Sequence, residues 1–177
     1  KFTSKASLED AKKLTNNLSI TYKINPIEPL MRSFDKSLSK EFKDLSKDIT
    51  EENIQARIRG VLLMAYANKF NGIVLATSNK SEVAVGYSTL YGDMVGGFSI
   101  LKDVPKTLVY KIAEEINRTS NIIPERILTR APSAELCKNQ TDQDNLPDYE
   151  VLDAILDLYI EQNKSIKMII KEGYSAQ

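Results

Sequence analysis

The feature that most constrains the fold is a long helical pattern that runs directly into a short apolar segment. Residues 51–70, EENIQARIRGVLLMAYANKF, carry apolar side chains at helical spacing, with Thr50 before them as the expected N-cap and Gly72 ending the pattern. Residues 73–76, IVLA, are apolar without alternation, which is typical of a strand buried on both faces of a parallel sheet. Because parallel strands need crossover connections, this order predicts an α/β fold.

The remaining chain is predicted to be mostly helical. Ser7 followed by Asp10 resembles a capping box at the start of a helix that ends near Asn17, and the alternation of residues 18–24, LSITYKI, predicts a strand. Further helices are expected over residues 29–42, 106–118, 148–162 and 165–172, the last with Gly173 as its C-cap. Residues 124–148 have no periodicity and are long for a loop, which indicates a functional segment. Together these elements predict an open parallel sheet with flanking helices.

Composition narrows the functional classes. The 177 residues carry 24 basic and 24 acidic side chains, so there is no basic excess of the kind that binds nucleic acid. No apolar run approaches the ~20 residues that cross a membrane, and the single Cys137 fits a reducing compartment, so we expect a cytoplasmic protein without membrane or nucleic-acid partners. The chain has no histidine, which excludes Ser-His-Asp and Cys-His catalysis and every histidine-containing zinc site within it.

A polar segment follows the predicted strand at residues 73–76. In open α/β sheets ligands bind beyond the carboxyl ends of the strands, which is where Thr77 and the next few polar residues fall. Residues 86–97 then contain four of the seven glycines, but neither GxGxxG nor GxxxxGK[ST] can be built from them. Two interpretations stay open: these glycines let the backbone approach a ligand, or they serve turns.

Several charged residues are candidates for contact with a phosphate or a metal. Glu82 is a lone carboxylate among hydroxyl groups, which suits Mg²⁺, but it also fits the start of a helix. Arg57 and Arg59 are two positions apart on a helix and point to different faces, so one could pair with an anion while the other is solvated or salt-bridged. Lys106 falls in the first turn of a helix, where a cation is unfavourable unless an anion binds nearby; otherwise it is a solvated surface lysine.

Four blocks of the sequence resemble the NAD synthetase family of the ATP-pyrophosphatase (adenine nucleotide α-hydrolase-like) superfamily. They are ENIQARIRG, ATSNKSEVAVGYSTLYGDMVGGFSILKDVPKTLVY, IPERILTRAPSAEL and QTDQDNLPDYEVLDAIL. The second block resembles the branch found in long, glutamine-dependent enzymes. The resemblance implies a Rossmann-like sheet and the last step of NAD biosynthesis, in which ATP and Mg²⁺ support amidation of deamido-NAD (nicotinic acid adenine dinucleotide) to NAD through an adenylated intermediate. It also implies ammonia or glutamine as nitrogen donor and a homodimer.

The resemblance implies one group of site residues for each substrate. The ATP group comprises Thr77, Lys106 and Ser133. The deamido-NAD group comprises Asn53, Arg57 and Glu82, and Glu82 is also the candidate metal ligand. Leu90 stands where ammonia-dependent enzymes often have a lysine, so no role is assigned to it.

The family's SGGxDS pyrophosphate loop and its glutaminase domain are not in these 177 residues. We therefore expect residues 1–177 to be the C-terminal portion of a synthetase domain whose fold is incomplete at the N-terminus, and we expect the isolated chain to be inactive. Two alternatives remain: another amidoligase of the superfamily, such as a relative of asparagine or GMP synthetase, or a non-catalytic fragment that dimerises. The helix at residues 51–70 favours self-association, because its apolar side chains occupy more than one stripe.

Overall fold

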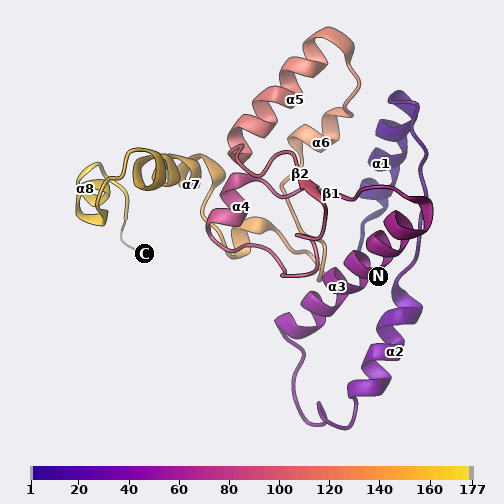
Figure 1. Ribbon diagram of the computed structural model, residues 1–177. Coiled ribbons are helices and arrows are strands. Elements are labelled where there is room, and N and C mark those ends of the chain that lie inside the picture. Colours follow the sequence, from indigo (N-terminus) through magenta and orange to yellow (C-terminus); the bar gives the residue numbers. More distant parts are fainter. Residues whose placement is uncertain (1, 176–177) are drawn as a thin grey trace.

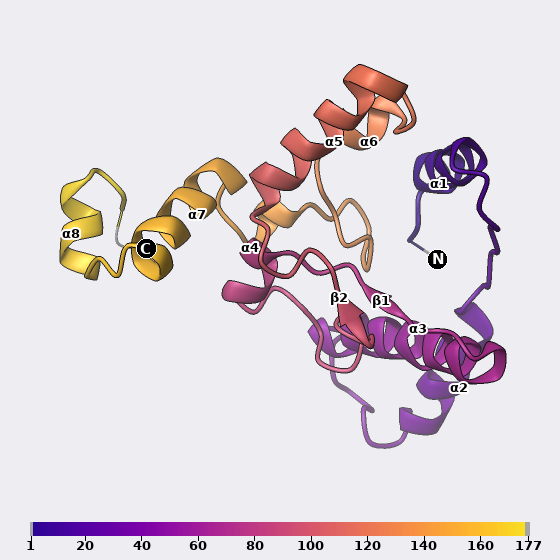
Figure 2. The same ribbon diagram turned by 45° about the horizontal axis from the view of Figure 1, so that its top comes forward.

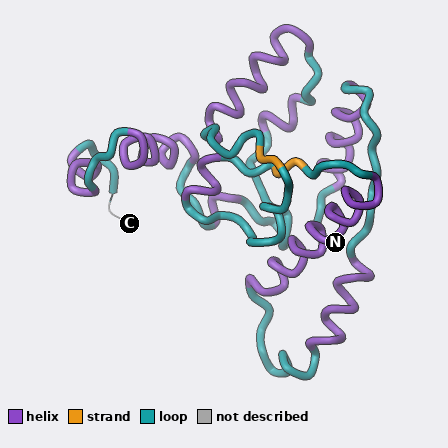
Figure 3. The backbone as a smooth tube through the Cα atoms, in the orientation of Figure 1, coloured by secondary structure: helices purple, strands orange, loops and turns teal. Residues whose placement is uncertain are grey.

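The computed structural model describes residues 2–175 and consists of helices arranged around a small parallel sheet (Figures 1 and 3). The helices are α1 (Lys5–Asn17), α2 (Glu28–Leu38), α3 (Ile49–Phe70), α4 (Lys80–Ala84), α5 (Lys106–Ser120), α6 (Glu125–Thr129), α7 (Tyr149–Leu156) and α8 (Ile166–Lys171). A 3₁₀ turn, η1 (Asp142–Asp144), precedes α7, and a π turn, η2 (Asp157–Glu161), follows it. Strands β1 (Leu75–Ala76) and β2 (Phe98–Ser99) pair in parallel, which agrees with the predicted α/β class.

The sheet lies between two groups of helices. Helices α5 and α6 lie on one side of it and α2 and α3 on the other, while α7 and α8 extend away from α1 (Figures 1 and 2). Each strand leads toward a helix, β1 toward α4 and β2 toward α5. Because β1 and β2 are parallel, their carboxyl ends meet at one edge, and the starts of α4 and α5 come together there.

Helix α3 begins at Ile49, two residues earlier than predicted. Asp48 is the N-cap: its Oδ1 accepts from the backbone N–H of Thr50 at 2.7 Å, and its own N–H donates to Glu51 Oε2 at 2.9 Å. This reciprocal capping box satisfies N–H groups that the first helical turn leaves without partners. At the other end, the C-cap is Asn71 in the left-handed conformation, one residue before Gly72.

Two glycines allow α3 to contact the loop of residues 86–97 closely. A Cβ on Gly92 would lie 2.8 Å from Ala56 Cβ, and a Cβ on Gly60 would lie 2.8 Å from the carbonyl oxygen of Tyr91. Gly92 has no positive φ, so neither turn geometry nor a ligand is needed to explain it. At this position the glycine is required by packing between the loop and the helix.

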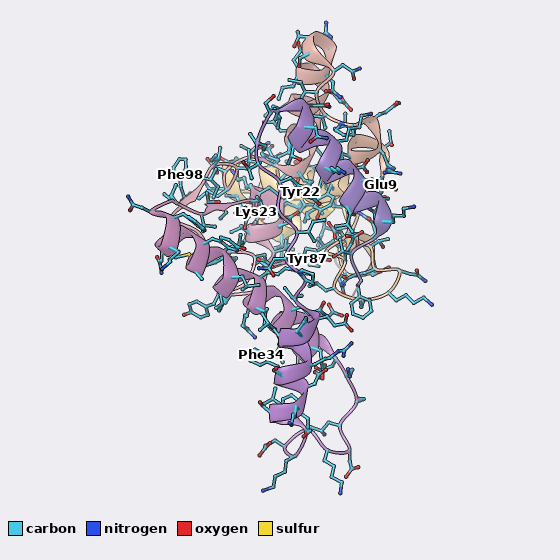
Figure 4. All side chains as sticks on the ribbon, turned by 90° about the vertical axis from the view of Figure 1, so that its right-hand side faces the viewer. Glu9, Tyr22, Lys23, Phe34, Tyr87 and Phe98 are labelled. Carbon is cyan, nitrogen blue, oxygen red and sulfur yellow. The ribbon has the colours of Figure 1, made fainter. Side chains whose placement is uncertain are left out.

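The strand predicted at residues 18–24 is wrong. Leu18 and Ser19 form a turn after α1, residues 20–24 carry no strand pairing, and Ile20 and Ile24 are 56% and 63% exposed. The cation of Lys23 lies 5.8 Å and 5.5 Å from the ring centroids of Tyr66 and Phe70 on α3, and Figure 4 shows the position of Lys23 on this segment. An alternating pattern needs a neighbouring strand, and none lies beside it among residues 2–175.

Other boundaries differ from the prediction by smaller amounts. The helix predicted at 29–42 ends at Leu38, the strand at 73–76 shortens to two residues, and the stretch 124–148 contains α6 and η1. The helix predicted at 148–162 is α7 continued by the π turn η2. The N-cap of α1 is Ser4 rather than Ser7, and the buried Asp10 pairs with Arg126 instead, at 2.7 Å.

Candidate functional site

Four of the six predicted site residues line one cavity at the carboxyl end of β1. The cavity has a volume of about 380 Å³. Its walls include Thr77, Glu82, Lys106 and Ser133, which come from the β1–α4 connection, α4, α5 and the segment after α6. The structure therefore brings together the three residues predicted for ATP and the carboxylate predicted for the metal.

Helix α4 places Glu82 at the cavity. The side chain of Asn79, only 4% exposed, accepts from the backbone N–H of Glu82 at 3.0 Å and so caps the helix. Glu82 is thus a carboxylate at a helix start and a cavity residue at once, which reconciles the two interpretations of it. The sequence indicates a helix start at Glu82 as one of two interpretations, but Asn79 was not identified as its cap, although Asn79 followed three residues later by a glutamate resembles a capping box.

Lys106 forms an ion pair with Glu82. Its Nζ lies 2.7 Å from Glu82 Oε1, and the two side chains are 18% and 20% exposed. The same ammonium lies 5.1 Å from the ring centroid of Tyr149, within the range of a cation–π contact. Lys106 is therefore not a solvated surface lysine, and a carboxylate of the protein supplies the anion that its position at a helix start requires.

Asp153 on α7 organises the start of α5. Its Oδ2 accepts from the backbone N–H and the hydroxyl of Thr107 at 2.9 Å and 2.7 Å, and its Oδ1 accepts from the hydroxyl of Ser81. The same Ser81 oxygen, fully buried, accepts from the backbone N–H of Lys106 at 2.8 Å. Since the N-cap residue Pro105 offers no side-chain hydrogen bond, α4 and α7 provide the cap. No local pattern could have revealed this, because Asp153 lies 46 residues beyond Thr107.

A buried carboxylate joins the segment after α6 to the cavity wall. Asp142, 4% exposed, accepts from the hydroxyls of Tyr149 at 2.7 Å and Tyr87 at 3.3 Å. Burial, followed by the nearby charge of Asp142, raises the pKa of Tyr87 to about 12. Burial and the hydrogen bond to Asp142 raise the pKa of Tyr149 well above its ordinary value. Asp142 and Ser133 both line the cavity, so part of the long stretch 124–148 reaches the candidate site, and its functional role stays a prediction.

The other two predicted site residues lie outside this cavity. Asn53 Oδ1 accepts from the Thr89 hydroxyl at 2.8 Å, and the exposed Arg57 donates through Nε to the carbonyl oxygen of Leu90 at 3.2 Å. Both residues of α3 therefore hold the loop of residues 86–97. Their contact with deamido-NAD stays a prediction.

The acidic residues fit a metal that arrives with a nucleotide. Among residues 2–175 no group of three or more histidine, cysteine or acidic side chains could hold a metal ion on its own. Glu82 Oε1 is taken by Lys106, whereas within that range Oε2 has neither a hydrogen bond nor an ion pair. One free carboxylate oxygen fits Mg²⁺, because this ion commonly uses one or two carboxylates together with phosphates and waters.

Comparison with known proteins shows which family this chain resembles. The model of the NAD synthase family matches residues 1–177. The chain belongs to this family. A glutamine-dependent NAD(+) synthetase from Aquifex aeolicus is 54% identical over 172 residues, which are 97% of this chain and 30% of that protein. One from Acinetobacter baylyi is 51% identical over 178 residues, 99% of this chain and 33% of that protein. The chain thus spans about a third of the curated NAD synthetases it matches.

Solved structures of family members agree with the fold. The glutamine-dependent NAD+ synthetase from Acinetobacter baumannii in complex with ADP is 45% identical with a TM-score of 0.72, over 99% of this chain and 31% of that one. The NMN synthetase from Francisella tularensis is 30% identical with a TM-score of 0.79, over 88% of this chain and 62% of that one. No helix within residues 2–175 has the length and apolar character needed to cross a membrane.

Proposed function

We propose that this chain, as one portion of a longer NAD synthetase domain, serves the ATP-dependent amidation of deamido-NAD to NAD. The observation that carries the proposal is the convergence of Thr77, Glu82, Lys106 and Ser133 on one cavity at the end of β1. In the reaction the nicotinate carboxylate attacks the α-phosphorus of ATP, pyrophosphate leaves, and ammonia from glutamine or solution then displaces AMP from the adenylated intermediate. Such a reaction needs positioning and charge neutralisation more than acid–base side chains, which suits a chain without histidine.

The cavity residues have distinct roles in this proposal. Lys106 offsets the negative charge of the phosphates, with its backbone held by Ser81 and its helix start held by Asp153. The hydroxyls of Thr77 and Ser133 donate to oxygens of the nucleotide. Glu82 would hold Mg²⁺ together with the phosphates, and a bound magnesium ion would neutralise charge on the transferring group.

We also propose that β1 and β2 belong to a wider open sheet in the full-length protein. The fold expected there is the Rossmann-like, adenine nucleotide α-hydrolase-like sheet. The parallel pairing of β1 with β2 and the helices on both sides support this arrangement, and so does the match to solved synthetases of which the chain covers only part.

A chimeric enzyme tests the activity. Residues 1–177 replace the matched segment of the Aquifex aeolicus synthetase, and NAD formation is followed with deamido-NAD, ATP, Mg²⁺ and glutamine. Lys106→Met should lower kcat about a hundredfold or more, since a lost charge contact in a transition state costs about 3 kcal/mol. Lys102→Met, a matched change at an exposed lysine four residues earlier, should leave kcat unchanged. Equal turnover in the two variants would remove Lys106 from the site.

A second candidate function follows from one structural neighbour. The Francisella tularensis protein is an NMN synthetase, and it covers 88% of this chain. The corresponding reaction would amidate nicotinic acid mononucleotide to NMN with the same ATP chemistry. Measuring kcat/KM of the chimera for the dinucleotide and for the mononucleotide decides between the two, and we expect the dinucleotide to be preferred.

We further propose that the protein is a homodimer that pairs through α3. Val61 and Met64, three positions apart on the helix, are 67% and 37% exposed, whereas Ile58 on the same helix is buried. This leaves an apolar stripe of α3 uncovered by residues 2–175, which supports an interface between two copies.

A further inference from the structure

Arg59 is a partly buried cation that forms no ion pair with the described residues 2–175. Burial lowers the pKa of its guanidinium, against a smaller opposite effect of the charge of Glu135. No hydrogen bond or ion pair within residues 2–175 engages this side chain, whereas the other five arginines each have a bonded partner in that range. Taking a charge out of water without a partner is unfavourable, so this arrangement indicates that something else satisfies Arg59.

Arg59 lines a second cavity that shares a wall with the candidate site. This cavity has a volume of about 720 Å³ and runs between α3 and the chain at residues 72–75, which lie next to each other in Figure 2. Thr77 and Asp93 line both cavities. A ligand in the 380 Å³ cavity could therefore extend a charged group toward Arg59.

Two carboxylates could neutralise Arg59: Asp93, which lines the same cavity, and Glu135, whose charge acts on the guanidinium, but both already have other partners. Both oxygens of Asp93 accept from the backbone N–H of Thr89, at 3.0 and 3.1 Å. Glu135 is bound by Arg130 at 2.6 Å and by the hydroxyl of Ser7 at 2.8 Å. Neither forms an ion pair with Arg59, and the neighbouring Arg57 is exposed and bonded to a backbone carbonyl.

We infer that Arg59, and not only the predicted Arg57, binds an oxyanion of the substrate that reaches the wall shared by the two cavities. The planar guanidinium donates two parallel N–H groups, which match either a phosphate or a carboxylate. The oxyanion comes from the phosphates of ATP or from the nicotinate carboxylate. The inference rests on the proposed function only for the identity of this ligand.

Anion binding to the chain tests the inference without turnover. Arg59→Met is compared with Lys69→Met, which removes a positive charge from an exposed position of the same helix, and pyrophosphate affinity is measured by calorimetry at constant salt. Arg59→Met should lower the affinity at least tenfold, and Lys69→Met should change it less than threefold. In the absence of ligand, Arg59→Met should melt at the same or a higher temperature than the unaltered chain, because it removes an unpaired, desolvated cation.

A second arm distinguishes the source of the oxyanion. Nicotinic acid mononucleotide carries a carboxylate on its pyridine ring, and nicotinamide mononucleotide carries an amide at the same position but is otherwise identical. If the carboxylate is the ligand, the unaltered chain prefers the acid, Arg59→Met erases that preference, and pyrophosphate affinity changes little. If Arg59→Met does not fold, Arg59→Gln is measured in its place.

Unchanged pyrophosphate affinity together with an unchanged preference for the acid overturns the inference, as does failure of the unaltered chain to bind either anion. A chimera without turnover would instead contradict the proposed function, and anion binding by Arg59 would stand.

Discussion

Asp153 connects three helices beside the candidate site. Its carboxylate accepts from Ser81, from the Thr107 backbone and from the Thr107 hydroxyl, and so ties α7 to α4 and α5. Asp153→Ala removes all three hydrogen bonds at once. The backbone N–H of Thr107 then loses its partner in the first turn of α5, where the helix itself supplies none.

The expected cost follows from these contacts. Loss of a capping side chain costs about 1 kcal/mol of folding free energy. A hydrogen bond to a charged group makes a net contribution to stability on the order of 1.5–3 kcal/mol when it is shielded from water. Because water reaches part of the site, we expect Asp153→Ala to lower the free energy of unfolding by about 3 kcal/mol. That corresponds to roughly 6–12 °C in Tm for a chain of this size. Asp153→Asn should cost only about 1 kcal/mol, since the amide oxygen still accepts from Thr107 while the amide group donates to Ser81.

Urea and thermal unfolding measure these differences. The matched control is Asp157→Ala, one helical turn later, where the exposed carboxylate accepts from Gln162 at 2.7 Å and from no other group of residues 2–175. The control should cost less than about 1 kcal/mol. If Asp153→Ala costs no more than Asp157→Ala, or if Asp153→Asn costs as much as Asp153→Ala, the assigned capping role is wrong.

Three further predictions concern the site and the surface. Glu82→Gln in the chimera should lower kcat about a hundredfold, with part recovered at higher Mg²⁺, because the lost charge acts where phosphate charge develops. Unchanged kcat with a slightly lower Tm would mean that the Glu82 charge only stabilises the start of α4. Since the pKa of Tyr87 is raised to about 12, its contribution to stability is complete below pH 10 and is lost as the pH rises toward 12. Tyr87→Phe should therefore flatten the fall in stability between pH 10 and 12, and an unchanged slope in alkaline urea titrations would contradict this. Val61→Asp should convert a dimer to a monomer in sedimentation at tens of micromolar, whereas a wild-type monomer under those conditions would refute the α3 interface.

Local sequence patterns determined the long helices and pointed to the edge of the sheet where the candidate site lies. Helices α3 and α5 were predicted nearly to their ends, because helical hydrogen bonds join residues four apart and the apolar spacing repeats within the segment. The position of Thr77 and Glu82 after a strand also followed from the sequence, since ligands of parallel sheets bind at that edge. The resemblance of four blocks identified the family, which the match over residues 1–177 confirms.

Tertiary structure decided the partners that come from distant parts of the chain. The segment 18–24 has the alternation of a strand, but a strand exists only where another strand pairs with it, and its neighbour in space is the face of α3 carrying Tyr66 and Phe70. The partner of a charged residue is likewise decided by tertiary structure. Whether Lys106 would face water, an external anion or Glu82 depended on how α4 and α5 meet, 24 residues apart in sequence. The sequence sets the charge and helical position of each residue, while long-range packing selects its partner, because that selection depends on contacts no local pattern encodes.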